Sequence, residues 1–433
     1  MIGITGYSVY IPRYRIQRET IAAAWGSRSK LGAKAVCHFD EDSLTMAEMA
    51  AWRLIVNGAA KPDRLYFAST SSPYWQRSAS SQIAAACDLT SSVNTIDFAG
   101  SLRSGTSAML AAFDALKAEN CASAIVVASD KRDGAPESQE ELTLSDAACG
   151  IELGTRNVIA EIIAIHSRSD DFMDEWRRDR DWFVQGQASK YSLARGYEEN
   201  VTAVRRAVLE RAGISNSDVI TAKAPANLGD TGTATPLIAL AHALANAKPG
   251  DLILCIGYGD GADALLLRAI IPGPAAEIAQ PVLEYPSYAL YRKSREYLRE
   301  TAGGADISNV LWKREERQNI RLHGSKCEIC GTVQFPMTRV CVACRSSEKI
   351  TELALGRTGR VFTFTKDYLY DAPMQPTVMT VVDLDGGGRF LCQMTDVHER
   401  DVRIGMPVEL VLRRMREGPH THHYYWKCRP GGS

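Results

Sequence analysis

The sequence lacks a long hydrophobic run, and no apolar stretch approaches the roughly 18 residues that a membrane-spanning helix needs. Its first residues also lack the basic segment and the continuous apolar segment of a secretory signal peptide. We therefore expect no membrane partner and a reducing compartment, the cytoplasm, for its eleven cysteines. In such a compartment, grouped cysteines bind metal more often than they form disulfides.

An excess of charge of either sign is also lacking. Fifty basic residues balance 51 acidic ones, for a formal net charge of −1. Proteins that bind nucleic acid or anionic lipid through their overall charge carry a positive excess, so we expect no nucleic-acid partner. What the chain does have is length: 433 residues, 45% of them hydrophobic, predict two or three soluble domains.

Residues 1–271 have the pattern of an α/β domain. Aliphatic runs at 122–128 and 251–257 predict buried strands, and small apolar residues at helical spacing predict a helix over 107–116. Each half has a Gly/Thr-rich loop that opens a helix, then a buried strand, then a polar segment that contains Asp130 or Asp263. This internal echo predicts a duplicated α/β unit.

Three further segments follow the α/β domain. Four prolines and a charged, aromatic stretch at 288–300 predict a helical linker over 272–321. A cysteine-rich ribbon is expected at 322–350. Over 351–433, short runs of alternating apolar and polar residues, such as 359–365 and 407–412, predict a small antiparallel barrel.

The cysteine-rich ribbon carries the most specific motif in the chain. Cys327, Cys330, Cys341 and Cys344 form two Cys-x2-Cys pairs, and each pair can aim two thiolates at one point. Gly331 permits the tight turn that the first pair needs. Four protein ligands close the metal shell, so the motif predicts a structural Zn²⁺, with iron in a rubredoxin-like site as the chemical alternative.

Several motifs of residues 1–271 resemble those of archaeal-type hydroxymethylglutaryl-CoA synthases. They include the opening Gly3-Ile-Thr-Gly-Tyr-Ser-Val-Tyr-Ile-Pro, Asp40-Glu-Asp-Ser-Leu-Thr45 and Asn227-Leu-Gly-Asp-Thr-Gly232. The resemblance implies the thiolase-superfamily fold, two similar halves in a layered αβαβα arrangement. From the ribbon onward the chain resembles zinc-ribbon plus OB-fold proteins that accompany thiolases, which implies acyl-CoA as ligand or substrate.

The resembled family uses a cysteine nucleophile at a strand-to-helix elbow, a glutamate acid/base and a histidine. Matching the elbow on Gly105-Thr106 places Leu102 at the cysteine position. The segment 67–74 places Thr70 at the glutamate position, and the nearest counterpart of the histidine turn begins at Lys223. None of these side chains can do the family's chemistry, so no catalytic residue is secure.

Weaker candidates surround these positions. Ser101 precedes Leu102, but a serine before a helix is more often an N-cap, which is what we expect here. Asn227 of the glycine loop is a second candidate. Near the end of the chain three histidines suggest a metal cluster, but neighbours in a strand point to opposite faces, so we expect a solvated barrel edge. These are His420, His422 and His423.

The sequence favours an acyl-CoA-binding, synthase-like subunit that works with a separate thiolase-type subunit, as a dimer or hetero-oligomer. The reaction would be C–C bond formation or cleavage, or acyl transfer on thioesters. One alternative is a self-sufficient enzyme that uses Ser101, Lys223 or Asn227. The weakest is a nucleic-acid-binding protein, since zinc ribbons and OB folds often have that role. The barrel residues that would serve it are Arg413, Arg414, Arg416, Tyr424, Tyr425 and Trp426.

Overall fold

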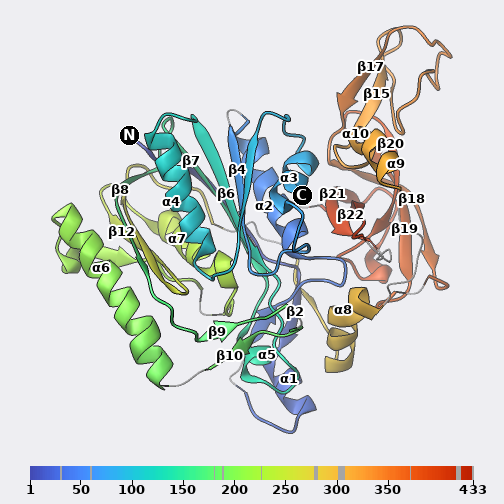
Figure 1. Cartoon of the computed structure of the whole chain (residues 1–433). Helices are drawn as coiled ribbons and strands as arrows, with labels where there is room; N and C mark the ends of the chain where they lie inside the picture. Colours follow the sequence, from blue (N-terminus) through green and yellow to red (C-terminus); the bar gives the residue numbers. More distant parts are fainter. Residues whose placement is uncertain are drawn as a thin grey trace. The chain divides into compact units, whose positions relative to one another are not determined.

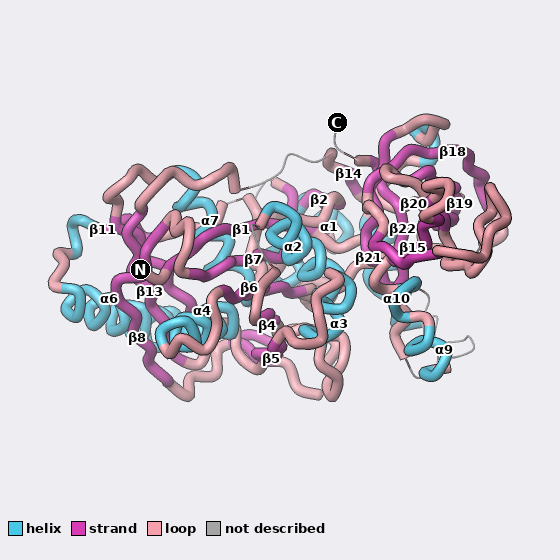
Figure 2. The backbone as a smooth tube through the Cα atoms, turned by 90° about the horizontal axis from the view of Figure 1, so that it is seen from above, coloured by secondary structure: helices cyan, strands magenta, loops and turns pink. Residues whose placement is uncertain are grey.

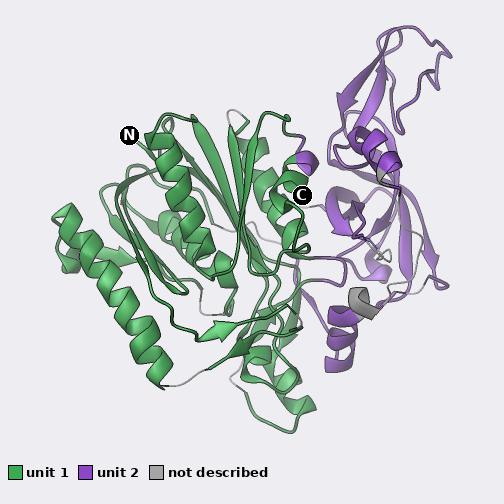
Figure 3. Ribbon diagram, viewed as in Figure 1, with its two compact units in different colours: residues 1–37, 42–84, 89–279 green, residues 38–41, 85–88, 280–433 purple. Residues whose placement is uncertain are grey.

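The computed structural model describes residues 1–29, 32–58, 61–179, 181–187, 190–225, 227–276, 281–300, 308–370, 372–415 and 421–431. Its contacts divide into two compact units (Figure 3). Unit 1 comprises Met1–Cys37, Asp42–Ala84 and Leu89–Ala279. Unit 2 comprises Gln280–Ser433 together with two short segments from the N-terminal half, His38–Glu41 and Ala85–Asp88. The finer boundaries drawn from the sequence remain predictions.

Unit 1 is built on a nine-stranded mixed sheet with the order β11-β12-β13-β8-β1-β7-β6-β4-β5. Its strands are β1 (Gly3–Tyr10), β4 (Arg64–Ala68), β5 (Asn94–Phe98), β6 (Ser123–Asp130), β7 (Ala147–Gly154), β8 (Ala160–Ser169), β11 (Val219–Thr221), β12 (Leu252–Tyr258) and β13 (Gly261–Ala269). β4 runs parallel to both β5 and β6, so the carboxyl ends of these three strands meet at one edge. The strands predicted at 122–128 and 251–257 are β6 and β12.

Helices separate the two halves of this sheet and cover its outer faces (Figure 1). α4 (Ser104–Lys117) and α7 (Thr235–Asn246) pack on β6 and β7 on one side and on β12 on the other, and share one apolar core with them. α2 (Ser43–Asn57) covers β1, β6 and β7, while α6 (Glu199–Ala212) covers β8 and β13. The layers of helix and sheet therefore follow the expected order αβαβα, which confirms the predicted thiolase-like fold class.

The first turn of α4 lies so close to η3 and β12 that two positions there have no room for a side chain. A Cβ added to Gly105 would lie 2.5 Å from the carbonyl oxygen of Thr233, just ahead of α7. A Cβ on Gly257 would lie 2.2 Å from the Thr106 hydroxyl. The glycines thus allow the helix that follows the elbow to lie directly against the second half of the unit.

The remaining elements of unit 1 are short. They are β2 (Tyr14–Gln17), α1 (Arg18–Ala24), β3 (Ala33–Ala35), α3 (Ala79–Ala86), α5 (Gln139–Thr143), β9 (Glu175–Trp176), β10 (Gln185–Gly186), η1 (Ser192–Glu198), η2 (Asn216–Asp218) and η3 (Gly232–Ala234). β9 and β10 pair as a small hairpin, so Trp176 lies in a strand.

Unit 2 contains the ribbon and the barrel (Figure 2), and its described residues also form several helices. The ribbon strands are β15 (His323–Cys327), β16 (Val333–Gln334) and β17 (Ile350–Ala354). The closed barrel has the order β18-β19-β20-β22-β21, with β18 (Thr358–Asp367), β19 (Thr377–Leu384), β20 (Arg389–Met394), β21 (Pro407–Arg414) and β22 (Tyr424–Pro430). The other elements are β14 (Leu283–Glu284), α8 (Tyr288–Glu300), α9 (Asn309–Arg314), α10 (Glu316–Asn319) and η4 (Glu399–Asp401). The helix predicted at 288–300 is confirmed as α8, and the predicted small barrel is present. Its strand pairs are antiparallel as expected, except that β20 and β22 pair in parallel.

One face of the β21–β22 pair binds the segment His38–Glu41 through buried charges. Arg413 lies 3.4 Å from a carboxylate oxygen of Asp40 and 3.1 Å from one of Glu41. Lys427 lies 2.9 Å from the other oxygen of Asp40. Arg413 also bonds to Asp396 at 2.7 Å. These side chains are at most 4% exposed.

The buried contacts of the barrel count against the alternative prediction that its basic and aromatic residues bind nucleic acid. Arg413 is 1% exposed and committed to carboxylates, so it is not available to phosphate groups. Tyr424 and Trp426 are buried in the barrel, at 3% and 1% exposure. Arg416 lies outside the described residues. The described barrel residues that suggested nucleic-acid binding are thus largely parts of its interior.

A second ionic cluster joins the ribbon to the segment Ala85–Asp88. His323 lies 3.1 Å from a carboxylate oxygen of Asp88 and pairs through its other ring nitrogen with Glu352. The hydrogen bond to Asp88 is the main cause of a raised pKa for His323, because burial alone would lower it. The folded state therefore holds the proton of His323 more tightly than the unfolded chain, in which the pKa is near 6.5.

We expect His323→Gln to lower the free energy of unfolding by about 1–3 kcal/mol at pH 6, because it removes a charged hydrogen-bond donor from a buried site. The contribution of His323 is complete below its unfolded-state pKa and is lost as the pH rises through its folded-state pKa. The deficit of the variant should therefore shrink toward pH 9. Hydrogen exchange of β15 and β17 in both proteins measures it, and a deficit that is constant with pH would contradict the assignment.

Candidate functional site

The elbow between β5 and α4 holds Ser101 and Leu102, both half-buried. The Ser101 hydroxyl donates a hydrogen bond to the carbonyl oxygen of Gly259 at 2.9 Å. α4 begins at Ser104, with Arg103 at its N-cap position. The expected N-cap role of Ser101 is therefore wrong, because the helix starts three residues later than the serine. The hydroxyl faces a backbone acceptor, and a carbonyl oxygen cannot take the proton of a nucleophile.

Thr70, which the motif match predicts at the position of the family's glutamate, follows the end of β4. Its backbone N–H and its hydroxyl both donate to one carboxylate oxygen of Asp130, at 2.7 and 3.1 Å. The Ser69 and Ser71 hydroxyls donate to the same oxygen, at 3.0 and 2.8 Å. The second oxygen accepts from the N–H and hydroxyl of Thr233. Thr70 is thus one of four residues that donate hydrogen bonds to the fully buried carboxylate of Asp130.

The second half of the unit contains a similar buried carboxylate that accepts several hydrogen bonds. Asp263 is fully buried and accepts hydrogen bonds from Thr106 at 3.0 Å and Ser107 at 2.8 Å, both in the first turn of α4. Its other oxygen accepts from Ser167 and pairs with Arg103 at 3.1 Å. Asp130 and Asp263 both lie in the polar segments that repeat between the two halves of the sequence. That repeat was the only feature of the sequence that pointed to these two buried aspartates.

The other candidates do not join a common site with Ser101. Lys223 and Asn227 are both exposed, on the connection between β11 and η3. Asp230, further along this connection, forms an isolated bridge with Leu144. The described residues of this connection include no histidine. The role suggested for Lys223 or Asn227 stays a prediction.

The cysteines of unit 1 are mostly buried thiols. Burial raises the pKa of Cys255 to about 12 and that of Cys149 further still. Both are fully buried thiols in strands. Cys37 is also buried, and Cys121 is half-buried before β6. Since the thiolate is the attacking form, the buried cysteines are inert, as expected of core residues.

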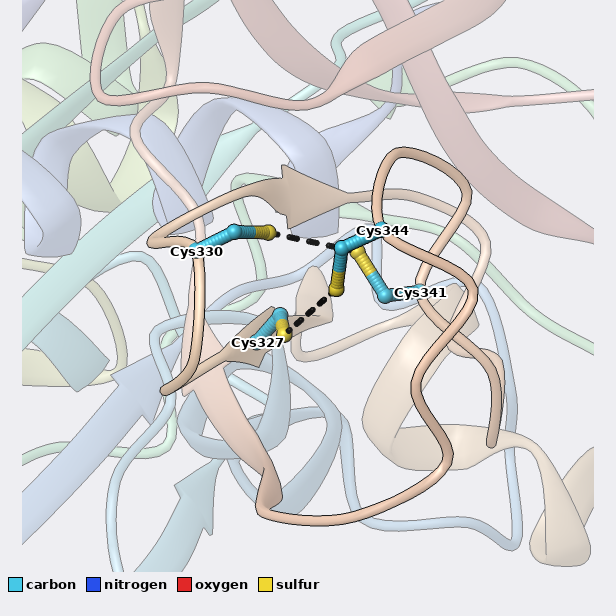
Figure 4. Close-up of side chains that lie close together, drawn as sticks. All are labelled: Cys327, Cys330, Cys341 and Cys344. Carbon is cyan, nitrogen blue, oxygen red and sulfur yellow. Dashed lines mark hydrogen bonds between the residues drawn. The ribbon is translucent and has the colours of Figure 1, made fainter.

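The structure brings the four predicted metal ligands together (Figure 4). The sulfurs of Cys327 and Cys344 lie 3.7 Å apart, those of Cys330 and Cys341 lie 3.5 Å apart, and all four lie within 4.8 Å of one another. Four sulfurs about 2.3 Å from a tetrahedral Zn²⁺ would be about 3.8 Å apart. The donor set and its spacing therefore fit zinc.

Local backbone geometry shapes the two cysteine turns. Gly331, directly after the first pair, has φ +77°, and its N–H donates to the Cys327 carbonyl at 2.8 Å. Arg345 follows the second pair with φ +65° and donates to the Cys341 carbonyl. A hydrogen bond with Thr332 lowers the pKa of Cys330 to about 6, which favours the thiolate that binds metal.

The C-terminal histidines do not converge in the described part of the chain. His422 bonds to Arg414 at 2.9 Å, whereas His423 bonds to Thr421 at 3.0 Å. His420 lies outside the described residues. Within the described ranges the four cysteines are the one group of at least three side chains placed to share a metal ion. The described helices include none that is long and apolar enough to cross a membrane.

Comparison with known proteins identifies relatives for both parts of the chain. Residues 314–349 match the rubredoxin-like zinc ribbon domain of ChsH2, and residues 352–413 match its C-terminal OB-fold domain. The hydroxymethylglutaryl-CoA synthase of Caldivirga maquilingensis is 28% identical over 349 residues, covering 70% of this chain and 99% of the relative. That of Methanopyrus kandleri is 26% identical over 344 residues, covering 69% and 98%.

Solved structures show the same fold for the N-terminal part. An HMG-CoA synthase complexed with CoA has a TM-score of 0.58 at 16% identity, covering 71% of this chain and 92% of its own. PksG, an HMG-CoA synthase from Bacillus subtilis, has a TM-score of 0.61 at 16% identity, covering 74% and 94%. These findings confirm the resemblance drawn from the motifs: a thiolase-like region with homologues among the hydroxymethylglutaryl-CoA synthases precedes a zinc ribbon and an OB-fold barrel like those of ChsH2.

Proposed function

We propose that this protein is an acyl-CoA-binding, synthase-like subunit that works in the cytoplasm with a separate, catalytically complete thiolase-type subunit. The complex forms or cleaves a C–C bond beside a thioester, or transfers an acyl group. The observation that carries the proposal is the elbow, where the motif match predicts Leu102 at the nucleophile position and the neighbouring Ser101 hydroxyl is bonded to a carbonyl oxygen. The zinc holds the ribbon in shape and has no place left for a substrate.

The exposed edge strand of the nine-stranded sheet supports the proposal that a partner subunit binds this chain. β5 is the last strand of the nine-stranded order and leads directly into the elbow. Its residues are all exposed or half-buried, and Ile96 is 40% exposed, whereas the neighbouring β4 is almost entirely buried. An exposed edge strand can pair with a strand of another chain through its backbone N–H and C=O groups. We propose that the thiolase-type subunit docks there and brings its cysteine close to the elbow.

If a partner subunit is required, mixing this chain with a thiolase-type chain should produce activity that this chain lacks alone. The purified chain alone should show no turnover of acetyl-CoA or acetoacetyl-CoA, and addition of a thiolase-type chain with an intact cysteine should restore turnover. Ser101→Ala should change the restored rate by less than about twofold, whereas loss of a true nucleophile costs about 10³-fold or more. Continuous measurement of free CoA with a thiol reagent reports the rate.

The alternative of a self-sufficient enzyme predicts the opposite pattern. Full turnover by the chain alone, abolished by Ser101→Ala, would replace the proposal. Pre-treating the partner with iodoacetamide before mixing provides the control, because alkylation of the partner's thiol should abolish the restored turnover.

A further inference from the structure

A buried guanidinium beyond the end of β6 is shared by two carboxylates. Arg132 is 2% exposed at its side chain. It pairs with Glu175 of β9, and it lies 3.4 Å from a carboxylate oxygen of Asp230. Asp230 is itself tied to the glycine loop, since it accepts from the Gly232 N–H at 2.9 Å. The side chain of Glu175 is 24% exposed, so it remains accessible although its cation is not.

This pair lies beside the position of the family's glutamate. β4 and β6 are parallel neighbours, so Thr70 and Arg132 both follow strands that end at the same edge. Arg177 donates to the carbonyl oxygen of Thr70 at 2.6 Å. Asp130 accepts the hydrogen bond of the Thr70 hydroxyl and is also a charged neighbour of Arg132, so the Arg132–Glu175 pair adjoins the Thr70 loop. On the other side, a Cβ on Gly232 would lie 2.4 Å from Asp130 and 2.8 Å from Arg132.

The charges around Glu175 favour a proton there near neutral pH. One cation, Arg132, faces the two carboxylates of Glu175 and Asp230, and Asp174 adds a third negative group. Like charges that share one site cannot all ionise easily. Burial, opposed by Arg132 and assisted by Asp230 and Asp174, raises the pKa of Glu175 to about 7. Asp130 is a further negative neighbour of Arg132. A carboxyl that titrates near neutrality suits general acid–base catalysis.

We propose that Glu175 is the acid–base residue of this site, in the role that Thr70 cannot fill. Its carboxylate removes a proton from the carbon next to the thioester carbonyl of a bound acyl-CoA. The C–H bond breaks, its electron pair forms the enolate, and an O–H bond forms on Glu175. The carboxyl returns the proton in the reverse step. No acyl group is transferred to this chain, so Leu102 is no obstacle. The inference rests on the proposed binding of acyl-CoA.

Solvent exchange tests this step without a partner or a complete reaction. The full chain is saturated with acetyl-CoA in D₂O, and mass spectrometry follows deuterium entering the acetyl methyl group. We expect exchange above the rate without protein, rising as the pH passes through about 7, because the ionised carboxylate is the base. Glu175→Gln should slow exchange about 100-fold or more and remove the pH dependence, and Glu175→Asp should retain part of the rate.

Two further measurements separate the possible failures. Glu210→Gln, at an exposed glutamate on α6, is the matched control and should leave exchange unchanged. Calorimetry with acetyl-CoA reports binding by each variant, and thermal unfolding reports whether each is folded. Absence of binding by the unmodified chain overturns the proposed function and this inference together. Binding without exchange, or exchange by folded Glu175→Gln as fast as by the unmodified chain, overturns the inference alone.

Discussion

Cys341→Ser should release the metal and unfold the zinc ribbon while unit 1 stays folded. The Cys341 side chain is fully buried, and its sulfur lies 3.5 Å from that of Cys330. Structural zinc contributes about 10–16 kcal/mol of binding free energy in small zinc domains, and that energy is folding energy. The ribbon has only three short strands and little apolar core of its own, so it should not stay folded without the metal.

Metal analysis and hydrogen exchange measure this effect. The unmodified chain should contain one equivalent of zinc, and the variant less than about a tenth of one, with protection lost in β15, β16 and β17. Cys121→Ser is the control, because Cys121 is half-buried in unit 1 and away from the cluster. Full zinc content in Cys341→Ser would contradict the assigned ligands. Iron in place of zinc in the unmodified chain would keep the site but change its ion.

Asp40→Asn should destabilise the β21–β22 face of unit 2 by about 3–5 kcal/mol, because it leaves buried cations without compensation. Burial alone would raise the pKa of Asp40, but Lys427, His38 and Arg413 outweigh it and hold the pKa well below 3.8. The folded state therefore depends on the ionised carboxylate. Its contribution is present above the unfolded-state pKa and is lost as the pH falls through the folded-state pKa.

Amide exchange in β21 and β22 reports the loss. A cost of about 3–5 kcal/mol corresponds to roughly 100- to 4,000-fold faster exchange where opening is local. Asp401→Asn, at an exposed carboxylate of η4, should have little effect. Adding Lys427→Met to Asp40→Asn should recover part of the stability, since removing both partners of a buried pair is far less costly than removing one. Unchanged protection in Asp40→Asn would show that the network contributes little.

The features that the sequence predicted well are those encoded locally. The cysteine spacing, the helix at 288–300 and the strands β6 and β12 follow from residues that are neighbours in the chain. The layered fold followed from motifs of a known family and from the echo between the two halves. Ser101 was assigned wrongly as an N-cap because element boundaries depend on packing, and Gly105 fixes where α4 lies.

The features that escaped prediction depend on contacts between distant residues. Asp40 was visible as part of a motif, but its partners Arg413 and Lys427 lie more than 370 residues later and carry no periodicity that marks them. Arg132 and Glu175 are 43 residues apart, and an isolated glutamate in a polar stretch resembles any solvated carboxylate. Only the folded chain shows that they share a buried site.

The central claim is that the covalent step, if the reaction has one, occurs on the partner. The most direct measurement is intact-mass analysis of both chains after the reconstituted complex is mixed with acetyl-CoA and quenched in acid. We expect an added acetyl group of about 42 Da on the thiolase-type chain and none on this one, because only a thiolate attacks a thioester readily here. An acetyl group on this chain, located by peptide mapping at Ser101, would contradict it.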